Sequence, residues 1–185
     1  SDVYKRQIVY HPSDISDKTE YAVEQFILSG GKSVIFVDPF FEKNDHSNKS
    51  SNLKNVLKTL NINYNSNVIL DGAQATRLQT QQNITENTSL QTMLKLNWPE
   101  VRGQYINQAE EIGDGLSLIR LVSPGGLSPL DDESEVSYTP IMSSSEVTMD
   151  LPMKEVHDPI KLINNFQPTV ISYDFGVKKS CIAKI

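Results

Sequence analysis

Short apolar runs alternate with amphipathic stretches over the first seventy residues of the chain. Residues 8–10, 34–37 and 68–70 are apolar runs of strand length, and the second has no polar position, as is typical of a strand buried on both faces. Residues 17–29 and 52–60 lie between these runs and carry apolar side chains at helical spacing. The pattern predicts strand, helix, strand, helix, strand, an order that indicates a parallel sheet with right-handed crossovers.

Residues with known helix-end preferences mark the limits of both predicted helices. Ser16 or Asp17 is suited to cap the first helix, and Glu20 stands at capping-box spacing from Asp17. Gly30 stands where a helix end favours a left-handed residue, and Asn61 is acceptable at the same place after the second helix. The helix boundaries therefore agree with the apolar periodicity.

The predicted fold class is α/β, a three-layer domain with a central, mainly parallel sheet and an additional β-rich C-terminal part. We expect Phe26 and Leu57 to pack the two helices onto the sheet. The α/β domain is assigned to residues 8–130, and residues 131–185 are assigned to a β-rich extension of it that is truncated at its C-terminus. Residues 1–7 fit poorly before the first strand and are interpreted as a sequence artefact or a disordered start.

The second half of the chain gives weaker signals. Residues 73–89 are rich in Gln, Thr and Asn, and the pattern leaves open a polar helix or a long ordered loop. Strands are predicted at several apolar or β-branched runs: residues 90–98, 104–106, 136–142 (broken by Pro140), 170–173 and 181–185.

Composition excludes several classes of function. The net charge is −6, and the 17 Lys and Arg residues form no basic run, so the sequence does not support nucleic-acid binding. Cys181 is the one cysteine, which rules out an intramolecular disulfide. No apolar run approaches the roughly 20 residues that span a bilayer.

Gly31-Lys32-Ser33 looks like the end of a phosphate-binding loop, but its context argues against one. Such a loop needs a glycine five positions before Gly31, where Phe26 stands, and it needs the order strand, loop, helix. Here the order is helix, glycines, strand, so a phosphate would meet the negative end of the helix dipole. We therefore expect no ATP binding, and we expect Lys32 to project partly into solvent from the turn before the strand.

One group of residues is a candidate ligand site. His11, Ser13 and Asp14 follow the first predicted strand, and Asp38 and Phe40 follow the second. In an open parallel sheet, ligands bind at the carboxyl ends of the strands. The alternative is that Asp38 only ends its strand.

No other residues form a convincing chemical site. The three histidines lack metal-ligand spacing, and the serines at 143–145 are interpreted as a loop after a strand. No nucleophile–base pair is visible, so the sequence predicts no catalytic residue, no metal and no cofactor.

The ordered series of segments resembles the GldG-like auxiliary components of ABC-type transport systems. The segments that carry the resemblance are residues 16–40, 53–71, 115–117 with 124–127, and 138–145. It covers residues 8–185 in order and departs from the family pattern at Asn61, where a glycine is usual. The resemblance implies a flavodoxin-like or class I glutamine amidotransferase-like fold, and similar domains occur in intraflagellar transport proteins.

The resemblance also implies a function. It is that of a non-enzymatic, extracytoplasmic accessory domain of a bacterial ABC-type complex, in some bacteria linked to gliding motility. The implied partners are the permease and ATPase subunits. The implied location is the inner membrane, with the domain facing the periplasm and anchored by transmembrane helices outside this fragment. The family has no established catalytic residues. The alternative function is a small-ligand or carbohydrate-binding domain at the strand ends.

Overall fold

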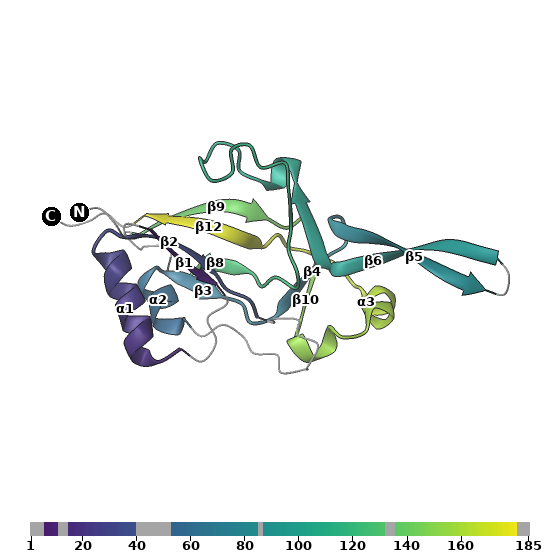
Figure 1. The fold of residues 1–185 in the computed structure, drawn as a ribbon, viewed down its shortest axis with the longest axis horizontal. Coiled ribbons are helices and arrows are strands. Elements are labelled where there is room, and N and C mark those ends of the chain that lie inside the picture. Colours follow the sequence, from purple (N-terminus) through teal and green to yellow (C-terminus); the bar gives the residue numbers. More distant parts are fainter. Residues whose placement is uncertain (1–5, 11–14, 40–52, 85–86, 132–135, 181–185) are drawn as a thin grey trace.

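A computed structural model describes residues 6–10, 15–39, 53–84, 87–131 and 136–180, and Figure 1 shows their arrangement. The helices are α1 (Asp17–Leu28), α2 (Lys54–Thr59) and α3 (Pro159–Asn165), with single 3-10 turns at Gly103–Tyr105 and Met153–Glu155. The strands are β1 (Arg6–Tyr10), β2 (Lys32–Phe36), β3 (Ile62–Tyr64), β4 (Val68–Asp71), β5 (Ala75–Ile84), β6 (Asn87–Arg102), β7 (Leu118–Arg120), β8 (Leu127–Pro129), β9 (Ser137–Ser143), β10 (Val147–Leu151), β11 (Thr169–Val170) and β12 (Asp174–Ser180).

The first three elements form the predicted β-α-β unit. β1 and β2 pair in parallel, with Ile8 opposite Val34 and Tyr10 opposite Phe36. Arg6 and Gln7, which were expected to precede the first strand, belong to β1 and pair with Lys32 and Ser33. Ser16 caps α1, because its hydroxyl accepts a hydrogen bond from the backbone N–H of Thr19 at 3.2 Å. The parallel pairing of the first two strands and the start of α1 are therefore confirmed.

The end of α1 is a Schellman motif. Gly30 has φ +88°, and its N–H donates to the carbonyl of Ile27 while the N–H of Gly31 donates to the carbonyl of Phe26. The Phe26 ring lies against Gly31, where an added Cβ would be 2.3 Å from the ring. Phe26 is therefore half-buried over the helix end, and the prediction that it packs α1 onto the sheet is wrong. Val23 and Ile27 make that contact.

α2 packs beside α1 through the predicted residue Leu57, which is buried. The core of this region, which we call the N-terminal core, is formed by one group of apolar residues from α1, α2, β1, β2, β3 and the residues next to them: Val9, Ile15, Val23, Ile27, Ile35, Val37, Leu53, Val56, Leu57, Leu60, Ile62 and Tyr64. Asn61 ends the helix in the left-handed conformation, with φ 53°. Its side chain exchanges two hydrogen bonds with the backbone of Asp131, so the helix end is tied to a distant segment.

The predicted three-layer α/β class with a central parallel sheet is wrong. The only parallel pair among the described strands is β1–β2, and the other three sheets are antiparallel. β4, predicted as the third parallel strand, pairs antiparallel with β10, with Val68 opposite Leu151 and Asp71 opposite Thr148. An apolar run reports burial and says nothing about the direction of the neighbouring strand, which here comes from about eighty residues further along the chain. The protein is mainly β.

The antiparallel sheets interleave the two halves of the sequence. Their strand orders are β11-β10-β4, β3-β8-β12-β9 and β5-β6-β7. A second core joins β4, β6, β10 and α3 and contains Val68, Leu70, Ala75, Leu96, Met149, Leu151, Met153, Val156, Leu162 and Phe166. The strands of residues 136–180 thus complete sheets that begin before residue 130.

Several local predictions change with this architecture. Residues 73–89 are neither helix nor loop but lie largely in the β5–β6 hairpin, and residues 103–105 are a 3-10 turn where a strand was predicted. The strand at 90–98 is confirmed within β6, and β9 continues through Pro140, which lies opposite Val177. The run at 34–37 is not buried on both faces. The strand predicted at 181–185 lies outside the described residues.

The β5–β6 hairpin projects from the body of the molecule. Figure 1 shows both strands extending together away from the other sheets and from α1 and α2. The strands pair continuously from Thr76 opposite Lys95 to Ile84 opposite Asn87. Its base, where β6 leaves β5 and joins β7, is therefore the junction between the arm and the body.

Candidate interaction site at the hairpin base

β6 changes partners at the base of the hairpin. The register jumps from Lys95 opposite Thr76 to Pro99 opposite Ala75, so the three residues between Lys95 and Pro99 face no residue of β5. The buried hydroxyl of Thr76 donates to the carbonyl of Trp98 at 2.6 Å. The N–H of Glu100 donates to the carbonyl of Gln74 at 2.7 Å. These bonds hold the bulge and fix the direction in which the arm leaves the body.

The bulge brings an aromatic ring and a cation together. Trp98 is half-buried, and the Lys95 ammonium lies 5.1 Å from the centroid of its ring. Such a contact contributes about 0.5–1 kcal/mol at an exposed position. Next to Trp98, Asn97 is buried and its amide donates to the hydroxyl of Ser123 at 3.0 Å, while the N–H of Ser123 donates back to the carbonyl of Asn97.

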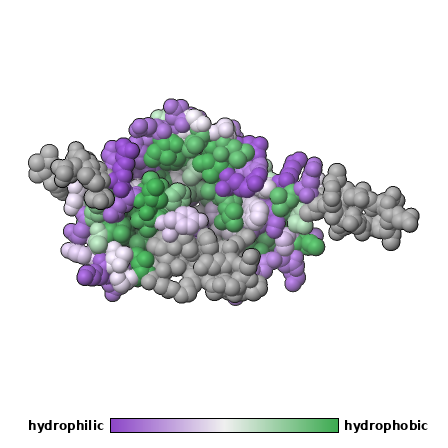
Figure 2. All heavy atoms as spheres, in the orientation of Figure 1, coloured by the Kyte–Doolittle hydropathy of each residue, from purple (hydrophilic) through white to green (hydrophobic). Residues whose placement is uncertain are grey.

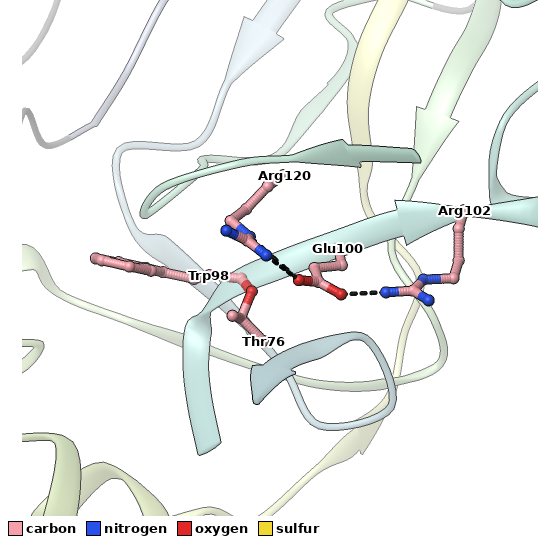
Figure 3. A network of polar contacts seen from close by, with 5 residues as sticks. All are labelled: Thr76, Trp98, Glu100, Arg102 and Arg120. Carbon is pink, nitrogen blue, oxygen red and sulfur yellow. Dashed lines mark hydrogen bonds and ion pairs between the residues drawn. The ribbon is translucent and has the colours of Figure 1, made fainter. Parts of the chain in front are cut away.

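Glu100 holds two arginines at the same base (Figure 3). One carboxylate oxygen accepts from Arg120 on β7, whose Nε lies 3.1 Å away, and the other accepts from Arg102. The hydrogen bond from Arg120 is the largest cause that holds the pKa of Glu100 below its ordinary value. The two arginine side chains are about half exposed, at 50% for Arg120 and 57% for Arg102. We call Thr76, Trp98, Glu100, Arg102 and Arg120 the hairpin base.

A buried polar cluster lies at the end of β4. Asp71 is fully buried, and its carboxylate accepts five hydrogen bonds from Ala73, Gln74 and Ser145 at 2.7–3.0 Å. Ser144 is buried too, and its hydroxyl donates to the carbonyl of Ser145 and accepts from the N–H of Tyr173. The serines at 143–145 therefore join strands, as a structural loop does.

The residues of the predicted ligand site are placed only in part. Asp38 is half-buried after β2, while His11, Ser13, Asp14 and Phe40 lie outside the described residues. The pKa of the neighbouring Tyr64 hydroxyl is raised by its burial and, to a smaller extent, by the Asp38 carboxylate. The ligand site therefore stays a prediction.

Two hollows open on the described surface. One, of about 400 Å³, lies between β10 and α3 and has Met149, Leu151 and Leu162 at its apolar wall and His157, Lys154 and Lys161 among its polar residues. The other is an open groove of about 610 Å³ between residues 103–108 and 140–143. Within the described ranges no three His, Cys, Asp or Glu side chains are grouped to hold a metal ion.

Sequence reasoning missed the hairpin base. β5 and β6 run beyond the body, so their sequences lack the alternation of apolar and polar residues that marks a half-buried strand. Repeated threonines in residues 76–92 were a usable signal, because β-branched residues favour strands. The pairing of Glu100 with Arg120 depends on the β6–β7 register, where the two residues are opposite each other.

The comparisons with known proteins place the chain in a class of transport proteins. The family model described as ABC-type uncharacterized transport system matches residues 4–174. The chain therefore belongs to this family of ABC transport auxiliary components, as the resemblance implied at the coarser level. Comparison with curated proteins and with solved structures gave no match. None of the described helices has the length and apolar character that a membrane crossing requires.

Proposed function

We propose that this chain is a non-enzymatic, extracytoplasmic accessory domain of a bacterial ABC transport complex. We propose further that it contacts the permease or ATPase subunits through the β5–β6 hairpin. Membership of the ABC-type transport family supports an accessory role in transport. The projecting hairpin is the observation that supports a binding role, because its two strands extend away from the sheets and helices that form both cores.

The hydrogen bonding of the buried polar groups supports the non-enzymatic part of the proposal. A nucleophile must lie within hydrogen-bond reach of a base and remain accessible to a substrate. Asp71, Ser144 and Ser145 are buried and bonded to one another, to backbone groups or to the Gln74 amide, so their hydrogen-bonding capacity serves the fold. Lys32 is exposed at the start of β2, after the Schellman motif, in a position where the described residues form no phosphate-binding loop around it.

The location and the wider context of the proposal rest on the resemblance to GldG-like components. That resemblance favours a position at the inner membrane with this domain facing the periplasm, and in some bacteria a link to gliding motility. The acidic net charge of −6 is compatible with a soluble domain beside a membrane.

A shortened hairpin tests the binding role. Replacing residues 79–92 by Asn-Gly joins Leu78 to Met93, which are opposite each other, through a two-residue turn. The base and both cores are untouched, so we expect the shortened protein to unfold cooperatively when its thermal unfolding is followed by circular dichroism. We expect at least a tenfold loss of co-purification of the full-length protein with its permease and ATPase.

The matched control retains the arm and alters an exposed aromatic elsewhere. Tyr21 on α1 is 61% exposed, and the substitution Tyr21→Ser should leave co-purification unchanged. Undiminished co-purification of the shortened protein would show that the hairpin is not the contact.

A further inference from the structure

The β1–β2 sheet carries an ordered, exposed array of side chains. The β1–β2 face consists of Arg6, Ile8 and Tyr10 on β1 and Lys32, Val34 and Phe36 on β2. In the parallel register these form three cross-strand pairs, first the two cations, then the two aliphatic residues, then the two aromatic residues. The aromatic rings lie 5.9 Å apart between centroids.

The apolar part of this face is solvent-exposed to an unusual extent. Ile8 is 76% exposed, Tyr10 66%, and Val34 and Phe36 are each 50% exposed. Figure 2 shows hydrophobic surface over the region where β1 and β2 lie in Figure 1. Four neighbouring large apolar side chains on one sheet face are a patch, which on soluble proteins marks a site of interaction.

The opposite face of the same sheet is covered by α1 and α2. Val9 and Ile35 point there and pack with α1 and α2 in the N-terminal core. Parallel sheets occur almost only with both faces covered, usually by helices. In the described part of the chain the β1–β2 face has no such cover, so a helix from elsewhere fits the missing layer.

The two cations at one end of the face indicate the direction in which a helix would lie on it. Arg6 and Lys32 are exposed, directly opposite each other, and in the described ranges neither forms an ion pair. A helix carries a negative partial charge at its C-terminal end, which cations stabilise. A helix that runs antiparallel to the strands, as α1 does on the opposite face, would place that end over the two cations.

We propose that the β1–β2 face docks an amphipathic helix of a partner protein. The helix runs antiparallel to β1 and β2, with its apolar stripe on Ile8, Tyr10, Val34 and Phe36, and its acidic C-terminal end over Arg6 and Lys32. The inference rests on the proposed accessory role, which supplies partner proteins. A five-residue strand and a helix of about 11 residues each span roughly 16 Å, so one helix covers the face.

The size of the face suits one docked helix better than a second copy of this chain. One helix of about 11 residues covers the six residues of the face, whereas a stable interface between two folded copies uses roughly 20 residues or more from each. The order of the residues argues for a helix over a lipid surface, because the cations lie at one end of the strands and do not surround the apolar pairs. Both occupants are outcomes of the test.

Fluorescence polarisation with two stapled helical peptides tests the docking site without the transport complex. Both peptides have about 14 residues and leucines along one face, and the last turn carries either two glutamates or two lysines on that face. We expect the glutamate peptide to bind the chain at least tenfold more tightly. Arg6→Glu with Lys32→Glu should reverse that preference, and Tyr10→Ser with Phe36→Ser should abolish binding of both peptides. Tyr21→Ser is the exposed aromatic control and should change neither affinity.

The outcomes that would contradict the docking site can be told apart from failure of the hairpin experiment, because the peptide test does not involve the transport complex. Equal affinity for the two peptides, no binding, or binding unaffected by the charge reversal would overturn the proposal. Binding to vesicles of three parts phosphatidylcholine and one part phosphatidylglycerol that is lost in the charge reversal, without peptide selectivity, would assign the face to a membrane. Dimerisation lost in the Tyr10→Ser, Phe36→Ser variant would assign it to a second copy. Circular dichroism confirms that each variant is folded.

Discussion

Asp71 shows how one buried carboxylate fixes the junction between two distant segments. Its five hydrogen bonds come from the turn after β4 and from Ser145, which precedes β10. We expect Asp71→Ala to lower the free energy of unfolding by about 3–5 kcal/mol, because several buried donors lose their acceptor together. Urea unfolding followed by circular dichroism measures the change. Asp114→Asn, at an exposed acidic residue, is the control and should stay within about 0.5 kcal/mol; an equal effect of the two variants would contradict the prediction.

Asp174 adds a dependence of stability on pH. Burial raises the pKa of its carboxyl above the ordinary value of 3.8, and the hydrogen bond from the Tyr138 hydroxyl at 2.8 Å only partly opposes that. The folded state therefore holds the proton more tightly than the unfolded state. Its contribution to stability is fully present below the unfolded pKa and is lost as pH rises through the folded pKa.

Asp174→Asn removes this titration while keeping an oxygen acceptor for Tyr138. We expect the stability of the variant relative to the parent protein to increase between pH 3 and pH 7, measured by urea unfolding at each pH. A stability difference that does not change with pH would show that Asp174 titrates alike in both states.

At the scale of elements, α2 depends on its neighbour for its N-terminal cap. The helix has six residues and no cap from its own side chains. Glu20 of α1 is buried, and its carboxylate accepts from the N–H of Asn55 at 2.7 Å, from the Asn55 amide at 2.8 Å and from the N–H of Val56 at 3.4 Å. One acidic residue thus binds the two helices together and meets the positive end of the α2 dipole.

Glu20→Ala should destabilise the protein by about 1–2 kcal/mol, because the first-turn N–H groups of α2 lose their acceptor. Thermal and urea unfolding measure the loss, and Lys18→Ala, an exposed position on the same helix, is the matched control. Amide hydrogen exchange should accelerate in α2 more than in α3. Equal effects of the two substitutions would show that α2 does not need this cap.

Local signals in the sequence were sufficient for the helix ends and insufficient for the sheets. Ser16, Gly30 and Asn61 each act within a few residues of the backbone they satisfy, so spacing alone locates them. The direction of β4 depends on β10, whose residues are about eighty positions away, and its apolar run is equally suited to either direction. The hairpin base is harder still, because Glu100 and Arg120 meet only through the β6–β7 register.

At the scale of the whole molecule, the described residues form two hydrophobic cores. Leu57 belongs to the core under α1 and α2, and Leu70 belongs to the core joining β4, β6 and α3. We expect Leu57→Ala and Leu70→Ala each to cost about 2–5 kcal/mol. Because the residues share no packing partner in these cores, the double variant should equal the sum within about 0.5 kcal/mol.

Leu57→Ala with Leu60→Ala is the matched pair within a single core, and we expect its two effects to be coupled. Chemical denaturation of the three single and two double variants measures both couplings. A coupling above about 1 kcal/mol between Leu57 and Leu70 would show that the cores act as one packed unit.

The composition of the N-terminal core has a consequence for folding during synthesis. All its apolar members lie between residues 9 and 64, whereas the second core needs partners from Val68 to Phe166. Because domains form as their residues leave the ribosome, the β1-α1-β2-α2 unit has all its packing partners while most of the chain is still being translated. β4 cannot form its pairing with β10 until the residues of β10 have been synthesised. The nascent chain therefore carries an unpaired strand with three apolar residues next to an assembled unit for about eighty residues of elongation, a period in which it is open to aggregation.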